Sequence, residues 1–208
     1  DVGTAGCAVS GTSLTWVKEG TCDLSATTAT TTNYNASDPS VQTWTINPPD
    51  AVAVAAGSDP STTYGTATTS SAFTSSGGTG SKSWTVALTA DASTVTGITI
   101  SSGGVISVAA TTAAGTYSMT VTATDVVGAT GTKASTVTVS RANLTVTASS
   151  HTVQYGADIP TVTPSYATFV NSEDASSASF TTGLTAPTCT TTYLATSAYG
   201  STPTTSCS

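Results

Sequence analysis

Hydrophobic and polar side chains alternate regularly over residues 115–125, which read Gly-Thr-Tyr-Ser-Met-Thr-Val-Thr-Ala-Thr-Asp. Tyr117, Met119 and Val121 fall on one side of an extended chain, and hydroxylated residues fall on the other. Because successive side chains of a strand point to opposite faces, this pattern predicts a strand with one buried and one exposed face. Residues 132–140 repeat the alternation after a glycine-containing turn, which indicates an antiparallel hairpin.

The same period of two recurs along the chain and predicts an all-β protein built from β-sandwiches. Further strands are expected at residues 12–17, 21–26, 41–46, 51–56, 83–89, 98–100, 105–108 and 144–148. The run Ser101-Ser-Gly-Gly104 joins two of them and is typical of a hairpin turn. A disordered chain is disfavoured, because disorder goes with few β-branched residues and no strict alternation.

Short junctions divide the chain into three units. Pro48-Pro-Asp50 interrupts the strand pattern, since proline cannot donate to a β-ladder. Arg141-Ala-Asn143 is all that separates the next two predicted strands. We therefore expect units at 1–47, 48–140 and 141–208. The second junction leaves little freedom, so the second and third units should be stiffly coupled.

Two stretches resemble repeats of large bacterial proteins. Residues 7–36 contain Cys-x-Val-Ser-Gly-Thr-x-Leu-Thr, Gly-Thr-Cys-x-Leu-x-Ala-Thr and Asn-Tyr-Asn-Ala. This pattern resembles the second half of immunoglobulin-like repeats in bacterial surface proteins. Residues 97–107 and 114–125 resemble the cadherin-like, immunoglobulin-type repeats of bacterial exported proteins. That resemblance implies a seven-stranded sandwich used as a segment of a rod.

The third unit resembles the MBG-type repeat of large adhesins. The stretches that carry this resemblance are residues 144–148, 154–156, Pro160, 166–171, Leu184 and Pro187-Thr-Cys189. The segment 198–203 departs from the usual pattern, and the closing strand of the repeat is not reached. Relative to these families the first unit lacks its opening strands and the third its last strand. The fold class expected is thus all-β, tandem immunoglobulin-like sandwiches with incomplete terminal units. The missing strands would come from neighbouring repeats or from another copy of the chain.

Four cysteines lie in two pairs, one near each end of the chain. In the surface-protein repeats the two cysteines tie adjacent strands, so the resemblance implies the disulfides Cys7–Cys22 and, by the same arrangement, Cys189–Cys207. A zinc site would need CxxC knuckles or histidine ligands, and the one histidine, His151, is distant in sequence. Disulfides indicate an oxidising, extracellular or cell-surface location.

Composition and charge exclude two classes of partner. The net charge is −7 and only 7% of residues are charged, so hydroxyls dominate the expected surface. The only cations are Lys18, Lys82, Lys133 and Arg141, and four scattered cations cannot neutralise a phosphate backbone. No apolar run approaches the ~20 residues that span a bilayer. We therefore expect neither nucleic-acid binding nor membrane insertion.

Metal binding and catalysis find little support in the sequence. Calcium takes 6–8 oxygen ligands, and the expected junctions carry only Asp50. Asp50, Asp125 and Glu173 are the candidates, and we expect no metal and no cofactor. A serine–histidine–aspartate arrangement would have to use His151, which is expected in an exposed turn. Lys133 is the only candidate for an intramolecular isopeptide bond, and its unit contains no glutamate.

Aromatic and sequon residues offer weaker hypotheses. Trp16, Trp44 and Trp84 could stack on a glycan if they shared an exposed face, but each lies in register with apolar neighbours, so core packing is expected. Asn35 and Asn143 fit the glycosylation pattern, which arises often by chance in a chain rich in serine and threonine.

The sequence thus predicts a non-enzymatic structural segment of an exported bacterial protein, serving as stalk, filament or surface layer. Its expected partners are copies of itself or neighbouring repeats. One alternative is an adhesin module that binds a glycan or another cell-surface ligand. A second is an accessory domain of a secreted hydrolase.

Overall fold

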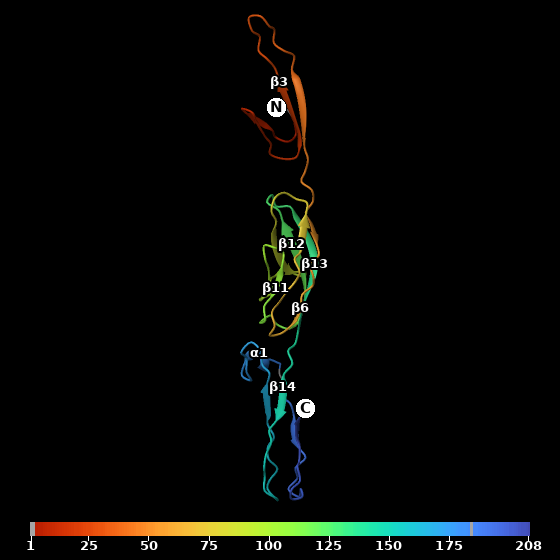
Figure 1. The fold of residues 1–208 in the computed structure, drawn as a ribbon, viewed down its shortest axis with the longest axis vertical. Helices are drawn as coiled ribbons and strands as arrows, with labels where there is room; N and C mark the ends of the chain where they lie inside the picture. The colour runs from red at the N-terminus through yellow and green to blue at the C-terminus, as the bar shows by residue number, and fades with distance from the viewer. Residues whose placement is uncertain (1–2, 184) are drawn as a thin grey trace.

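The computed structural model describes residues 3–183 and 185–208, and within them the chain is all-β apart from one four-residue helix. This confirms the fold class. Strand-rich segments follow one another along the long axis of the molecule (Figure 1). No strand pairing among the described residues crosses 48–50 or 141–143. Leu184, which carries part of the adhesin resemblance, lies outside the described residues.

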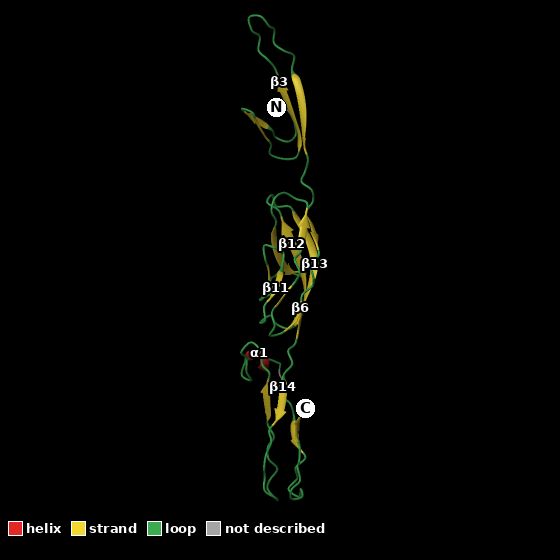
Figure 2. Cartoon of the chain, viewed as in Figure 1, coloured by secondary structure: helices red, strands yellow, loops and turns green. Residues whose placement is uncertain are grey.

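The first segment consists of two hairpins. Strand β1 (Ala8–Ser10) pairs with β2 (Ser13–Thr15), and β3 (Gly20–Ala26) pairs antiparallel with β4 (Ser40–Ile46). A long loop joins β3 to β4 and extends away from the rest of the molecule (Figure 2). Each hairpin is a two-stranded sheet of its own, and in the described chain neither hairpin pairs with a further strand.

The middle segment is the sandwich. Its strands are β5 (Ala53–Ala55), β6 (Ser61–Thr63), β7 (Thr68–Thr69), β8 (Thr74–Ser76), β9 (Ser83–Leu88), β10 (Ile98–Ile100), β11 (Ile106–Val108), β12 (Gly115–Thr124) and β13 (Thr130–Ser140). One sheet has the order β6-β13-β12-β9 and the other β10-β11-β7. Together these sheets hold the seven strands that the resemblance implies. The β5–β8 pair is additional.

The core lies between these two sheets. Strand β12 contributes Met119 and Val121, whose burial confirms the predicted inward face. Ile106 and Val108 of β11 pack against them from the opposite sheet and are also fully buried. Burying a side chain of this size stabilises the fold by roughly 1.5–3 kcal/mol. The alternation read from the sequence therefore corresponds to the best-packed part of the molecule.

The third segment again consists of small sheets. Strand β14 (Thr145–Ala148) pairs with β15 (Pro164–Ala167), helix α1 (Ala178–Thr181) follows, and β16 (Cys189–Thr191) pairs with β17 (Thr205–Cys207). The ring of Phe180 meets those of Tyr166 and Phe169 edge-on, with centroids 5.0 and 5.1 Å apart. This small aromatic cluster holds α1 against the end of β15.

Candidate functional site

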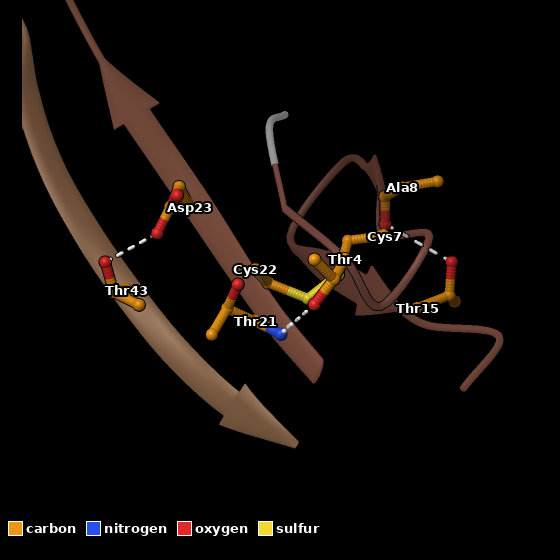
Figure 3. The surroundings of a disulfide bond; sticks show 8 residues. All are labelled: Thr4, Cys7, Ala8, Thr15, Thr21, Cys22, Asp23 and Thr43. Atoms are coloured by element: carbon orange, nitrogen blue, oxygen red, sulfur yellow. Dashed lines mark hydrogen bonds between the residues drawn. A yellow bond between two sulfur atoms is a disulfide. The ribbon is translucent and has the colours of Figure 1, made fainter. Parts of the chain in front are cut away.

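The first disulfide holds the start of the chain against β3. Cys7 lies just before β1 and is bonded to Cys22 in the middle of β3, whose side chain is completely buried (Figure 3). Two hydrogen bonds lie beside it: the Ala5 amide donates to the Thr21 carbonyl, and the Thr21 amide donates to the side-chain oxygen Thr4 Oγ1. The disulfide and these two bonds thus hold residues 4–7 against the beginning of β3.

The second disulfide lies across a β-ladder. Cys189 of β16 is directly opposite Cys207 of β17, with the Cα atoms 4.1 Å apart. The neighbouring residues Thr188 and Ser208 exchange both backbone hydrogen bonds, so the cysteines occupy the closely spaced, non-hydrogen-bonded position. Both expected pairings are therefore present, and two disulfides indicate an oxidising, extracellular environment.

The tryptophans correct one expectation. Trp84 of β9 packs against the sandwich core as predicted, but Trp16 and Trp44 are 53% and 57% exposed. Trp44 stands opposite Cys22 on the apolar face of the β3–β4 pair. Its alternation with polar residues predicted the face correctly. In the described chain the β3–β4 pair is a sheet of its own, and Trp44 stays exposed on this face although Cys22 is buried. Trp16 lies after β2, outside that pair, and is exposed as well. The expectation of core packing was therefore wrong for both side chains.

Strand β4 also has an open edge. Its hydrogen bonds within the described chain run to β3, and the seven residues Ser-Val-Gln-Thr-Trp-Thr-Ile carry neither charge nor proline. All but Ile46 are exposed, including Val41 on the opposite face from Trp44. Natural edge strands usually carry lysine, proline or a bulge that prevents pairing with other chains. This edge has none of those devices and is chemically suited to accept another strand.

The third segment is similarly open. Val146 of β14 is exposed, as are Leu144 before it and Ile159 in the loop beyond it. A globular core would bury residues of this kind. Exposed apolar side chains thus occur on the strands of both terminal segments, whereas the sandwich is well packed between its sheets and its own exposed valines, Val126 and Val127, lie in the β12–β13 turn.

The junction between the second and third segments is bridged by side chains. The Tyr64 hydroxyl donates to Glu173 Oε1 at 2.5 Å. The Ala110 carbonyl accepts from the Gly65 amide at 2.9 Å and from Asn171 Nδ2 at 3.1 Å. Val170 packs closely against Gly65: a Cβ added to Gly65 would lie 2.6 Å from the Cβ of Val170. Glu173, a calcium candidate, therefore lies at this joint.

The other calcium candidates lie at the opposite end of the sandwich. Asp125 is buried at the β12–β13 turn, where its carboxylate accepts the backbone amides of Thr79, Val127 and Ala129 at 2.7–3.0 Å. These bonds, led by the one from Thr79 and opposed by burial, lower the pKa of Asp125 below its ordinary value. Asp50 lies nearby across the Gly77–Gly78 turn. In the described chain no three acidic, histidine or cysteine side chains gather as a metal site.

The remaining candidates are exposed. His151 lies in the loop after β14, and its Nε2 is 2.9 Å from Ser149 Oγ, which also accepts the Thr163 amide. This contact between residues two apart fixes a turn, and no carboxylate is hydrogen-bonded to the ring in the described structure. Lys133 is exposed on β13, although it lies on the same face of the strand as the buried residues Ser135 and Val137. Its charge disfavours pairing of another chain with the part of the β13 edge that β6 does not cover. Asn35 and Asn143 are exposed in loops.

The described part of the chain forms no helix long and apolar enough to cross a membrane. Comparison with protein-family models and with curated protein sequences finds no match.

Proposed function

We propose that the chain is a non-enzymatic structural segment of an exported bacterial surface protein, used in a stalk, filament or surface layer. The observation that carries this proposal is the contrast between a closed central sandwich and two terminal segments whose apolar faces are open. In the proposed role those faces are covered by neighbouring repeats or by copies of the same chain.

The arrangement of the segments supports a load-bearing role. They follow one another along a single axis (Figure 1), and the second joint is bridged by Tyr64, Glu173 and Asn171. Each terminal segment contains a disulfide, Cys7–Cys22 between the start of the chain and β3 and Cys189–Cys207 between β16 and β17, and each limits how far the residues it encloses extend when the chain is stretched. Few lysines and arginines also leave few sites for trypsin-like proteases.

Strand addition is the proposed means of contact. An isolated two-stranded ribbon is marginal in water, so the β3–β4 pair would gain stability from a third strand on the open edge of β4. A strand donated from the far end of another copy makes a head-to-tail contact. Contacts of that type do not close on themselves, and they extend into filaments.

Sedimentation equilibrium of the whole chain tests completion by copies. We expect species heavier than the 20.3 kDa chain, with the emission of Trp16 and Trp44 moving to shorter wavelength as concentration rises. A single 20.3 kDa species at every concentration, with unchanged emission, would contradict association between copies. Electron microscopy of the native assembly would then show whether neighbouring repeats of one protein cover the open faces.

A second function is favoured by one observation. Trp16 and Trp44 are both about half exposed in the same segment, as a ligand-binding adhesin module would require. Binding to intact cells by the whole chain, lost on replacing both tryptophans with alanine while the sandwich stays folded, would support this alternative over the structural role.

A further inference from the structure

A groove of about 670 Å³ lies between two segments of the third unit. One wall comes from residues 150–155 and Pro160, and the other from Thr191, Tyr193, residues 197–203 and Thr205. In Figure 1 these are the two arms that extend beyond β14 and β17 at the C-terminal end of the molecule. The volume falls within the range of roughly 300–1,000 Å³ that is usual for small-ligand sites.

The base of the groove is fixed by Tyr193. This side chain is only 8% exposed, and its hydroxyl lies within hydrogen-bond distance of two carbonyls of the opposite arm, those of Gln154 at 3.3 Å and Ala157 at 3.1 Å. Its amide also donates to Thr191 Oγ1, at the end of β16. The two arms are thus tied together at one point, and the second disulfide anchors the strands beneath. The groove is a built shape and not merely a gap between loops.

Two further tyrosines line the groove and are presented to solvent. Tyr155 is 71% exposed and Tyr199 is 96% exposed, one from each arm. Within the described structure neither hydroxyl takes part in any of the hydrogen bonds that hold the arms. Covering these rings with a ligand would remove a large apolar area from water, while each tyrosine keeps its hydroxyl for hydrogen bonding. The rings and hydroxyls of both tyrosines are therefore available to contact a ligand.

The polar lining is rich in hydrogen-bonding groups and free of charged side chains. It includes several serine and threonine hydroxyls, the Gln154 amide and the His151 ring, but no aspartate, glutamate, lysine or arginine. A charged ligand would lose its hydration here without gaining a partner of opposite charge. A neutral ligand that offers both many hydroxyls and flat C–H faces would match both parts of the lining.

We infer that this groove binds a neutral oligosaccharide, with Tyr155 and Tyr199 stacking on sugar faces and Gln154 and His151 bonding sugar hydroxyls. Proline-rich peptides also dock in aromatic grooves. Proline-rich peptides carry few hydrogen-bonding groups, whereas the groove lining has many. An oligosaccharide, with many hydroxyls, matches this lining better. This binding activity goes beyond the structural role proposed above and does not depend on it.

Titration calorimetry of the whole chain tests the inference, with cellotetraose, maltotetraose, chitotetraose and mannotetraose as probes. We expect at least one to bind with a Kd at or below about 1 mM, which corresponds to modest contacts. Tyr155→Ala and Tyr199→Ala should each weaken that binding by about tenfold, on the scale of one lost stacked ring. Tyr34→Ala, at an exposed tyrosine of the first segment, is the matched control and should change nothing.

Salt and a competing ligand sharpen the result. Binding of a neutral sugar should be the same at about 0.05 and 0.5 M NaCl, because screening acts on charges. The variants replace exposed side chains, so their melting temperatures should equal that of the parent. The inference is overturned if none of the four sugars binds at about 10 mM, if Tyr199→Ala binds as well as the parent, or if decaproline binds in the groove and the sugars do not.

Discussion

Asp125 shows how a single carboxylate organises one end of the sandwich. One oxygen accepts the Thr79 amide from the turn before β9, and the other accepts two amides of the β12–β13 turn. The carboxylate thus satisfies three backbone donors and joins two loops that are distant in sequence. Charge-assisted bonds of this kind are stronger than neutral ones. All of them engage the oxygens that a calcium ion would need.

The first prediction concerns the titration of Asp125. Its folded pKa is lowered below 3.8, chiefly by the Thr79 amide, so ionised Asp125 stabilises the fold above that pH. This stabilisation is lost as pH falls through the folded pKa. Asp125→Asn leaves an NH₂ group facing a backbone donor, so its melting temperature should be several degrees lower at pH 7, and the difference should narrow toward about pH 2.

Thermal melts followed by circular dichroism across this pH range measure that difference. Asp38→Asn, at an exposed position in the first segment, controls for the loss of one charge. A gap between Asp125→Asn and the parent that stays constant with pH would show that the carboxylate charge is not what holds the turn.

At the scale of elements, the terminal segments and the sandwich are stabilised by different means. The sandwich buries aliphatic side chains between two sheets, whereas each terminal ribbon relies on a disulfide. A ribbon of two strands buries little apolar area, so a covalent link supplies a larger share of its stability, between β16 and β17 in one segment and between β3 and the start of the chain in the other. The effect of reduction should therefore be local.

Cysteine replacement tests this division. Cys189→Ser with Cys207→Ser removes a link between residues 18 positions apart in sequence, which the chain-entropy model values at roughly 3 kcal/mol. We expect amides of β16 and β17 to exchange with solvent up to about a hundredfold faster, since each 1.4 kcal/mol is a factor of ten. Amides of β12 and β13 should be unaffected, and their acceleration would contradict local stabilisation. The Cys7–Cys22 pair provides the parallel experiment on β3.

The open edge of β4 leads to a prediction on association. Val41→Lys places a charge on an exposed strand that has none, which is how natural edges resist pairing. We expect the self-association proposed above to weaken by tenfold or more in sedimentation equilibrium, as for the loss of about 1.4 kcal/mol. Val126→Lys, at an exposed valine of the β12–β13 turn, adds the same charge away from that edge. If both substitutions weakened self-association equally, the added net charge and not the β4 edge would be responsible.

The sequence revealed the elements with strong alternation and missed those without it. The predicted strands at 115–125 and 132–140 correspond to β12 and β13, because apolar residues there recur every second position. Strands β6, β7 and β8 consist of serine and threonine, so only tertiary pairing defines them. Alternation also predicts which face Trp44 occupies but not whether another layer covers it. Contacts such as Tyr64–Glu173, 109 residues apart, leave no local signal.

At the scale of the molecule, the two joints differ in construction. The segment 47–52 connects the first unit to the sandwich, and no hydrogen bond in the described chain links the two across it. The second joint has the Tyr64–Glu173 bond, the shared Ala110 carbonyl and the packing of Val170 on Gly65. We therefore expect the sandwich and the third segment to move as one body while the first reorients more freely.

Gly65 provides a direct test of this stiffness. It has a φ of +94°, and a side chain there would lie within 3 Å of Val170, so Gly65→Val should push the third segment away from the sandwich. Gly128 has a φ of +90° with open space around it, which makes Gly128→Val a control for backbone strain alone. Residual dipolar couplings should give one common alignment for both segments in the parent and in Gly128→Val. In Gly65→Val they should give two. Separate alignments already present in the parent would mean that the bridging contacts do not hold the joint, and the load-bearing role would lose its main mechanical support.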